Sequence, residues 1–383
     1  MKKALCLIFC IALFALTLTA CGNTDPNTHP FVVTDKAARE NITVTLSSTD
    51  SDDTLELKLK KDRLSNESSS VFTGNADTAL YDRVVITADG VESEELAYND
   101  YTDGWDLSSG RCYPGLDNAE YTPKYERKTF DYQKRTKDIL IWTPEDYGEN
   151  PDEKYSVIYM TDGQNLFDRS ATSTGSWAVA ESALAMAANG GEKCIIVGIE
   201  NADGWRDDEL TPDIGEVLSQ DYEDGHGAYF SDFVVDAVMP YINENYSVYT
   251  DREHTHICGS SSGGIESFYI AMEHPDKFSS VGALSPAFLL YSDETWVDYL
   301  SKKDFSENAP LVYLYCGNGK ADQLEQQLYI GTVAMPDTLK KIGYPEDKVV
   351  MKLYEDGIHN EMYWRAVFPD YLKYAFPKTE SAQ

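Results

Sequence analysis

The feature that most constrains the fold is the alternation of strand-like and helix-like segments that begins near residue 127. Short apolar runs such as 155–160 and 194–199 have the length and composition of buried strands, and stretches with helical spacing separate them. Because parallel strands need long crossover connections, which are usually helices, this alternation predicts an α/β fold with a mostly parallel sheet covered by helices on both faces. The strands are expected at 137–142, 155–160, 194–199, 255–258, 281–284, 311–315 and 349–354, and the helices at 176–188, 229–246, 262–273, 324–342 (interrupted at Pro336) and 361–376.

The part of the chain before residue 127 has a different pattern of polar and apolar residues. Between residues 31 and 115, polar and apolar residues alternate with a period of two in short stretches, at 42–46, 55–60 and 84–87, and turn-forming residues separate them. This pattern predicts a small all-β sandwich domain over 31–115, ahead of the α/β domain at 127–378. Three aromatic residues near its end either pack in its core or form a platform on which sugar rings stack: Tyr98, Tyr101 and Trp105.

The first residues are typical of an exported protein. Lys2 and Lys3 precede an apolar run that ends at Leu18, which is the pattern of a secretory signal peptide. The run leads into Leu18-Thr19-Ala20-Cys21, which resembles the lipobox of bacterial lipoproteins. That resemblance implies a signal peptide over 1–20, a lipidated Cys21, and a tether over 21–30 that holds the protein outside the cytoplasmic membrane or at the cell surface. Ordinary secretory cleavage near Ala20 is the alternative.

Charge and cysteine content narrow the range of partners. The chain has 65 Asp plus Glu residues against 32 Lys plus Arg residues, a formal net charge of -33. Such a field repels phosphate backbones, which argues against nucleic-acid binding.

Of the 7 cysteines, those within the apolar strand-like runs are expected to be buried free thiols: Cys194, Cys258 and Cys316.

One motif between a strand and a helix carries nucleophile chemistry. Residues Gly259 to Gly263 read G-x-S-x-G, directly after an apolar strand and at the start of a helix. In this context the motif predicts a nucleophile elbow, a sharp turn that exposes the Ser261 hydroxyl above the sheet edge. The backbone N–H of Ser262 then points from a helix N-terminus toward a developing anion.

A serine nucleophile needs a base. His359 follows the last predicted strand directly, so it is expected at the same sheet edge as Ser261. His226, in the loop before a long helix, remains an alternative. The other histidines fall elsewhere, in the tether, on the opposite sheet edge as surface residues, or at a helix end: His29, His254, His256 and His274.

The imidazole needs an acid that fixes its tautomer, and the tetrahedral intermediate needs a second N–H donor. The loop after the penultimate strand offers Asp322, with Glu325 as the alternative. The second N–H donor is expected from the loop 161–167, which follows the strand predicted at 155–160; its candidate is the backbone N–H of Gln164. The chain order Ser, Asp, His is the one expected of the α/β-hydrolase fold. No metal and no organic cofactor is required.

Further side chains are expected at the pocket rim, because they lie on loops at the same edge. Aromatic walls there would suit a cinnamoyl group or a sugar ring. Core packing is the alternative for each tryptophan, and a structural ion pair is the alternative for Arg206. The candidates are Trp177, Asp203, Trp205, Arg206, Tyr229 and Trp364.

Several ordered motifs resemble the esterase D-like group of α/β-hydrolases, which includes the feruloyl and acetyl-xylan esterases of carbohydrate esterase family one and the enterochelin-esterase-like hydrolases. The resemblance implies a cofactor-free serine esterase with Ser261, His359 and Asp322 as triad and Gln164 and Ser262 as oxyanion donors. The acid loop departs from the family's shorter Gly-Thr-x-Asp/Glu turn. The motifs are 159–167, 197–201 with Arg206, 239–242, 259–264, 284–286, and 357–361 with Trp364.

These observations together predict an exported serine esterase that acts on an ester-bearing small molecule or polysaccharide. Deacylation of plant polysaccharides or oligosaccharides carrying feruloyl or acetyl esters is the expected reaction. A siderophore trilactone esterase and a non-catalytic glycan-binding lipoprotein are the alternatives.

Overall fold

The computed structural model describes most of the chain from residue 28 onward. The predicted signal peptide, Cys21 and Asp322 lie outside the described residues. Among the residues described, no helix combines the length and apolar character needed to span a membrane. The described ranges are 28–35, 39–61, 70–77, 81, 83–93, 95–97, 104–106, 111–113, 122–168, 171–188, 191–218, 225–320, 323–354 and 357–377.

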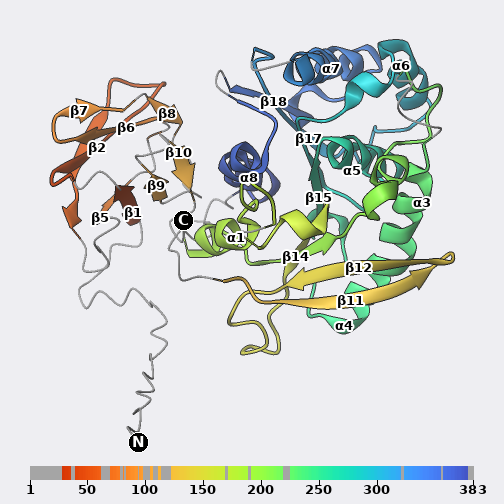
Figure 1. The fold of residues 1–383 in the computed structure, drawn as a ribbon, viewed down its shortest axis with the longest axis horizontal. Coiled ribbons are helices and arrows are strands. Elements are labelled where there is room, and N and C mark those ends of the chain that lie inside the picture. The colour runs from red at the N-terminus through yellow and green to blue at the C-terminus, as the bar shows by residue number, and fades with distance from the viewer. Residues whose placement is uncertain are drawn as a thin grey trace, which may run out of the picture.

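The larger part of the molecule is built on an eight-stranded sheet (Figure 1). Strands β11 and β12 form an antiparallel hairpin at one edge, and every pairing from β14 to β18 is parallel. The predicted mostly parallel sheet is therefore confirmed. In spatial order the strands are β11 (Tyr125–Tyr132), β12 (Arg135–Trp142), β14 (Cys194–Ile199), β13 (Ser156–Thr161), β15 (Thr255–Ser260), β16 (Ser280–Leu284), β17 (Leu311–Gly317) and β18 (Val349–Tyr354).

Helices cover both faces of this sheet, and each face has its own apolar core. One core packs residues of α1 and α8, such as Val179 and Phe368, against the sheet. The other packs Phe233, Phe268 and Leu339 from the helices of the opposite face. The helices are α1 (Val179–Ala188), α2 (Arg206–Glu209), α3 (Gly227–Asp232), α4 (Met239–Asn245), α5 (Ser262–Glu273), α6 (Asp293–Leu300), α7 (Gln323–Lys341) and α8 (Glu361–Ala375).

The N-terminal part forms two smaller sheets around a separate core that includes Phe31, Val44 and Ile86. Their pairings are antiparallel apart from β1 with β9. Strand β1 begins at Thr28, within the segment predicted as tether. One sheet holds β10 (Arg111–Tyr113), β9 (Gly104–Asp106), β1 (Thr28–Asp35), β5 (Ser70–Asp77) and β4 (Lys60–Lys61); the other holds β3 (Thr54–Lys58), β2 (Ile42–Ser47), β6 (Arg83–Ala88), β7 (Val91–Glu92) and β8 (Leu96–Ala97).

The predicted helix over 229–246 is helical as far as Asn245, but its middle has the hydrogen-bond spacing of a π-helix. A π-helical segment, Phe233–Val238, separates α3 from α4, and the Met239 N–H donates to the Val234 carbonyl. Pro240, at the start of α4, has no N–H to donate, so the chain changes its hydrogen-bond spacing just before it. The expected interruption at Pro336 was wrong, because α7 continues through this residue with Met335 and Leu339 buried in the core.

A buried ion pair joins the edge hairpin to α2. Lys137 Nζ donates to both carboxylate oxygens of Glu209, at 2.6 and 2.7 Å, and the Ala202 N–H donates to the same carboxylate at 2.8 Å. Both side chains are almost fully enclosed. Removal of one partner of such a pair leaves an uncompensated charge in the interior.

We expect Lys137→Met to lower the free energy of unfolding by about 3–5 kcal/mol, because the Glu209 carboxylate then stands buried without its cation. The double variant Lys137→Met/Glu209→Gln keeps an acceptor for Ala202 and removes the charge, so it recovers most of the loss. Urea denaturation of the three proteins measures this. A double variant no more stable than Lys137→Met would contradict it.

Candidate active site

The predicted elbow is present between β15 and α5. Ser261 adopts φ 58° and ψ -127°, a conformation that L-residues rarely occupy. The turn is held by backbone hydrogen bonds, because the Ser261 N–H donates to Leu284 and its carbonyl accepts from Gly264, Ile265 and Ala287 at 3.0–3.1 Å. Strain of this kind persists where the surroundings over-determine the backbone, and it is common at functional sites.

Thr161 leaves no space for a side chain at either glycine of the motif. A Cβ added at Gly259 or at Gly263 would lie 2.2 Å from the hydroxyl oxygen of Thr161, the last residue of β13. Thr161 therefore fills the space between the end of β15 and the first turn of α5. The motif spacing reflects this close approach as well as the sharpness of the turn.

His359 lies on the short connection between β18 and α8. Its ring meets the ring of Trp364 edge to face, with centroids 4.9 Å apart. The Trp364 indole N–H donates to the Ser285 hydroxyl at 3.4 Å, one residue beyond the carbonyl that accepts from Ser261. Asn360 caps α8 by accepting from the Tyr363 N–H. These contacts place the histidine at the sheet edge that carries the elbow.

The two acid candidates differ in what the structure says of them. Asp322 lies outside the described residues. Glu325, in the first turn of α7, is buried, and its carboxylate lies against the end of β17: a Cβ on Gly317 would be 2.7 Å from Glu325 Oε2 and 2.2 Å from the Gly357 carbonyl. Glu325 and the residue Gly357, two positions before His359, therefore both lie close to Gly317. The choice between the two stays a prediction.

The loop after β13 carries the predicted oxyanion donor Gln164 in a short 3-10 turn, Gly163–Asn165. Asp162, just before it, adopts a left-handed backbone with φ 53°. Arg206 donates to the Asp162 carboxylate from Nε at 2.7 Å and from Nη2 at 2.8 Å. Of the two interpretations of Arg206, the structural ion pair is the one observed.

The predicted rim residues divide into two groups. Trp177 is buried, and its ring packs on Trp364 and Phe368 with centroids 5.5 and 6.2 Å away, so core packing holds for it. Trp205 is 57% exposed. The Arg135 guanidinium lies 5.2 Å from the Trp205 ring and 4.9 Å from the Tyr229 ring. The sequence reasoning missed Arg135, which starts β12 and extends past the end of β14.

His226, the alternative base, directly precedes α3, and its N–H donates to the Asp208 carbonyl of α2 at 2.8 Å. His256 was expected at the surface, which was wrong: it is buried against Phe376, it hydrogen-bonds Ser280 at 2.8 Å, and burial lowers its pKa to about 3. His254 pairs with Asp251. Among the described residues, no group of three or more His, Cys, Asp or Glu side chains has the arrangement of a metal site. Cys194, Cys258 and Cys316 are free and buried, as expected.

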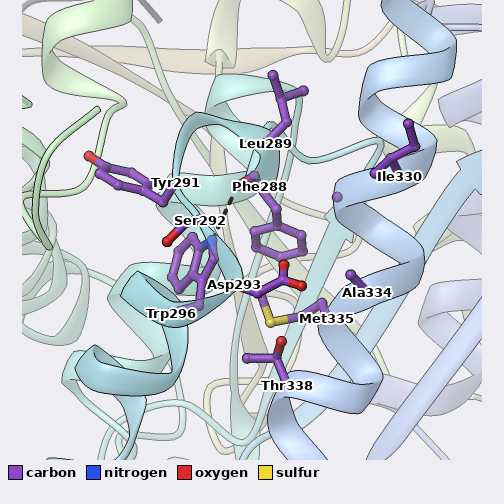
Figure 2. Close-up of a pocket in the computed structure, with 11 residues that line it drawn as sticks. Phe288, Leu289, Tyr291, Ser292, Asp293, Trp296, Ile330, Ala334, Met335 and Thr338 are labelled. Atoms are coloured by element: carbon purple, nitrogen blue, oxygen red, sulfur yellow. Dashed lines mark hydrogen bonds between the residues drawn. The ribbon is translucent and has the colours of Figure 1, made fainter. Parts of the chain in front are cut away.

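A separate apolar groove lies on the helical layer, with a volume of about 230 Å³. Figure 2 shows Phe288, Trp296 and Met335 around it, with Ile330 on the α7 side. None of the predicted catalytic or rim residues lines it. The groove is therefore distinct from the candidate active site.

The nucleophile helix also carries a buried carboxyl group that sequence reasoning missed. Glu266 is fully enclosed, and neither of its oxygens has a hydrogen-bond partner in the described part of the chain. Burial, together with the nearby charges of Glu209 and Glu273, raises the pKa of Glu266 well above 4.5. The only signal in the sequence is a glutamate within the mostly apolar stretch Ile265–Met272 of this helix.

We expect Glu266→Gln to raise the melting temperature increasingly as pH rises from 4 to 8. Burial raises the pKa of Glu266 in the folded protein, so the carboxyl keeps its proton at pH values where it is ionised in the unfolded chain. Between the unfolded and the folded pKa, the wild type therefore loses stability as pH rises, by about 1.4 kcal/mol per pH unit from this group. Glutamine does not titrate. Thermal melts at four pH values check this, and a difference that does not change with pH would contradict it.

Comparisons with known proteins give this geometry a family context. A family model described as "Putative esterase" matches residues 132–375, which is more than half of the chain. The uncharacterized protein YbbA of Bacillus subtilis (strain 168) is 23% identical over 232 residues, which cover 59% of this chain and 88% of that protein.

Solved structures share the fold at low sequence identity. The siderophore hydrolase EstA from Aspergillus nidulans has a TM-score of 0.55 at 16% identity, covering 68% of this chain and 95% of that one. The enterobactin esterase FES from Shigella flexneri, solved in the presence of enterobactin, has a TM-score of 0.55 at 13% identity, covering 91% and 92%. The ferulic acid esterase AmCE1/Fae1A from Anaeromyces mucronatus has a TM-score of 0.50 at 20% identity, covering 68% and 93%.

Proposed function

The chain belongs to this esterase family and is a carboxylic ester hydrolase, and we propose that it acts outside the cytoplasm on acylated plant polysaccharides or oligosaccharides through a Ser261 acyl-enzyme. The single observation that carries the mechanism is the left-handed Ser261 backbone at the N-terminus of α5. A serine with this backbone, between a strand and a helix N-terminus, is typical of a nucleophile elbow, in which the hydroxyl is exposed above the sheet.

The proposed reaction follows from these positions. His359 takes the Ser261 proton as the hydroxyl oxygen attacks the ester carbonyl, and Asp322 or Glu325 stabilises the resulting imidazolium. The N–H groups of Gln164 and Ser262 hold the tetrahedral oxyanion. The alcohol leaves with the proton from His359, and water then repeats the sequence on the acyl-enzyme.

The proposed substrate class rests on the rim and the N-terminal segments. Trp205 presents an exposed indole close to Arg206, which binds the loop that bears Gln164. A flat, exposed aromatic side chain suits a feruloyl ring or a sugar. The predicted signal peptide and the predicted lipid anchor at Cys21 would place the protein outside the cytoplasm, which supports action on an extracellular polymer.

The siderophore trilactone esterase remains the second candidate, and one observation favours it. The match to the enterobactin esterase FES covers 91% of this chain, so it extends beyond the large sheet into the N-terminal part. Against it stands the net charge of -33, which repels an anionic ferric chelate.

We expect Ser261→Ala to lower kcat by about 10⁴-fold or more on p-nitrophenyl acetate and methyl ferulate, because no acyl-enzyme forms. Ser260→Ala is the matched control, since this neighbouring hydroxyl is buried at the end of β15. A third substrate, a catecholate trilactone, separates the two candidate functions. Equal rates for wild type and Ser261→Ala above the uncatalysed rate would overturn the Ser261 mechanism. Rates no higher than the uncatalysed rate for both proteins would favour the non-catalytic glycan-binding alternative.

We expect Cys21→Ser to move the protein from the membrane fraction to the soluble exported fraction, because a serine cannot form the thioether that carries the lipid. Fractionation of expressing bacterial cells, with Cys112→Ser as control, measures this. Retention of the serine variant in the membrane would contradict the anchor.

A further inference from the structure

The strongest unassigned arrangement near the elbow is the ion pair between Asp162 and Arg206. Asp162 is 5% exposed and directly precedes the turn that carries Gln164. A Cβ on Gly263 would lie 2.9 Å from Asp162 Oδ2, so the carboxylate lies against the first turn of α5. A buried negative charge therefore lies between the two elements whose N–H groups are proposed to bind an oxyanion.

Such a charge is unfavourable for the reaction unless it is balanced. A full carboxylate charge opposes the negative charge that develops on the substrate oxygen, and the opposition is strong where water is excluded. The structure provides the balance from α2: Arg206 donates two hydrogen bonds to the Asp162 carboxylate, and the Asn201 amide donates a third at 2.6 Å. Two parallel bonds from one guanidinium fix geometry as well as charge.

The same contacts set the position of the donor loop. The Gln164 side chain accepts from the Asn201 N–H at 3.3 Å, and the Asn165 N–H donates to the Asp162 carbonyl at 2.9 Å. Gly163 leaves no room to shift, because a Cβ there would be 2.5 Å from the Gly198 carbonyl carbon. The loop is thus held between β14 and the elbow.

We propose that Arg206 is a positioning residue that neutralises Asp162 and thereby keeps the oxyanion site at Gln164 both in place and free of an opposing charge. This inference rests on the proposed serine-esterase mechanism. It assigns Arg206 no contact with substrate. It also predicts that substitutions of the two partners have unequal effects on catalysis. Both substitutions break the ion pair between Arg206 and Asp162, and substitution of Arg206 also removes its 3.3 Å contact with the exposed Asp207 carboxylate.

The test is a double-mutant cycle on p-nitrophenyl acetate hydrolysis, with kcat and KM measured separately. We expect Arg206→Gln to lower kcat about 100-fold with KM changed less than about threefold, because the unpaired carboxylate opposes the transition state more than the bound ester. Asp162→Asn keeps the acceptor oxygen and removes the charge, so its kcat falls less than about fivefold. Arg206→Gln/Asp162→Asn regains at least about tenfold over Arg206→Gln.

Controls separate this inference from folding and from the mechanism itself. Arg127→Gln removes an exposed arginine that pairs with Asp138 of β12 and with Glu200, which follows β14, and we expect it to leave kcat unchanged. Urea denaturation of every variant reports whether it is folded. If Arg206→Gln is unfolded, Arg206→Lys is used in its place. We then expect a smaller fall in kcat, which the addition of Asp162→Asn again reverses.

Equal losses for Arg206→Gln and Asp162→Asn, or no recovery in the double variant, would overturn the inference while the wild type remains active. An inactive wild type, or one matched by Ser261→Ala, would instead overturn the proposed function.

Discussion

The structure depends on one strained turn. At Ser261 the chain leaves β15 and enters α5 through a backbone conformation that L-residues rarely adopt, and four backbone hydrogen bonds and the close approach of Thr161 keep it there. The contact with Thr161 ties the turn to β13, and the hydrogen bond to Leu284 ties it to β16. The strands β13 and β16, which pair in parallel with β15 on its two sides, thus both hold the strained turn.

Much of the fold was predictable because its signals are local. The bounds of β14, β18 and α5 match the predicted ranges, since an unbroken apolar run or a G-x-S-x-G motif carries its own limits. The mostly parallel sheet followed from the alternation of elements. Helix α6 was missed, because its signals are a Ser292 cap and only a few buried residues.

The rest of the site could not be predicted, because it depends on contacts between residues far apart in the chain. Nothing near Arg206 in the sequence indicates a pairing with Asp162, and nothing near His256 shows that Ser280 and Phe376 enclose it. Trp177 and Trp205 look alike as sequence, yet one is buried and the other exposed. Such differences are set by packing, which a pattern of residue types does not specify.

The close approach of Gly163 to Gly198 limits how this enzyme can change. Neither position has space for a side chain, so the floor beneath the donor loop is fixed in shape. Exposed positions such as Trp205, whose ring lies 5.2 Å from the Arg135 guanidinium, have space for other side chains. We therefore expect engineered changes in substrate preference to come from such positions and not from the two glycines.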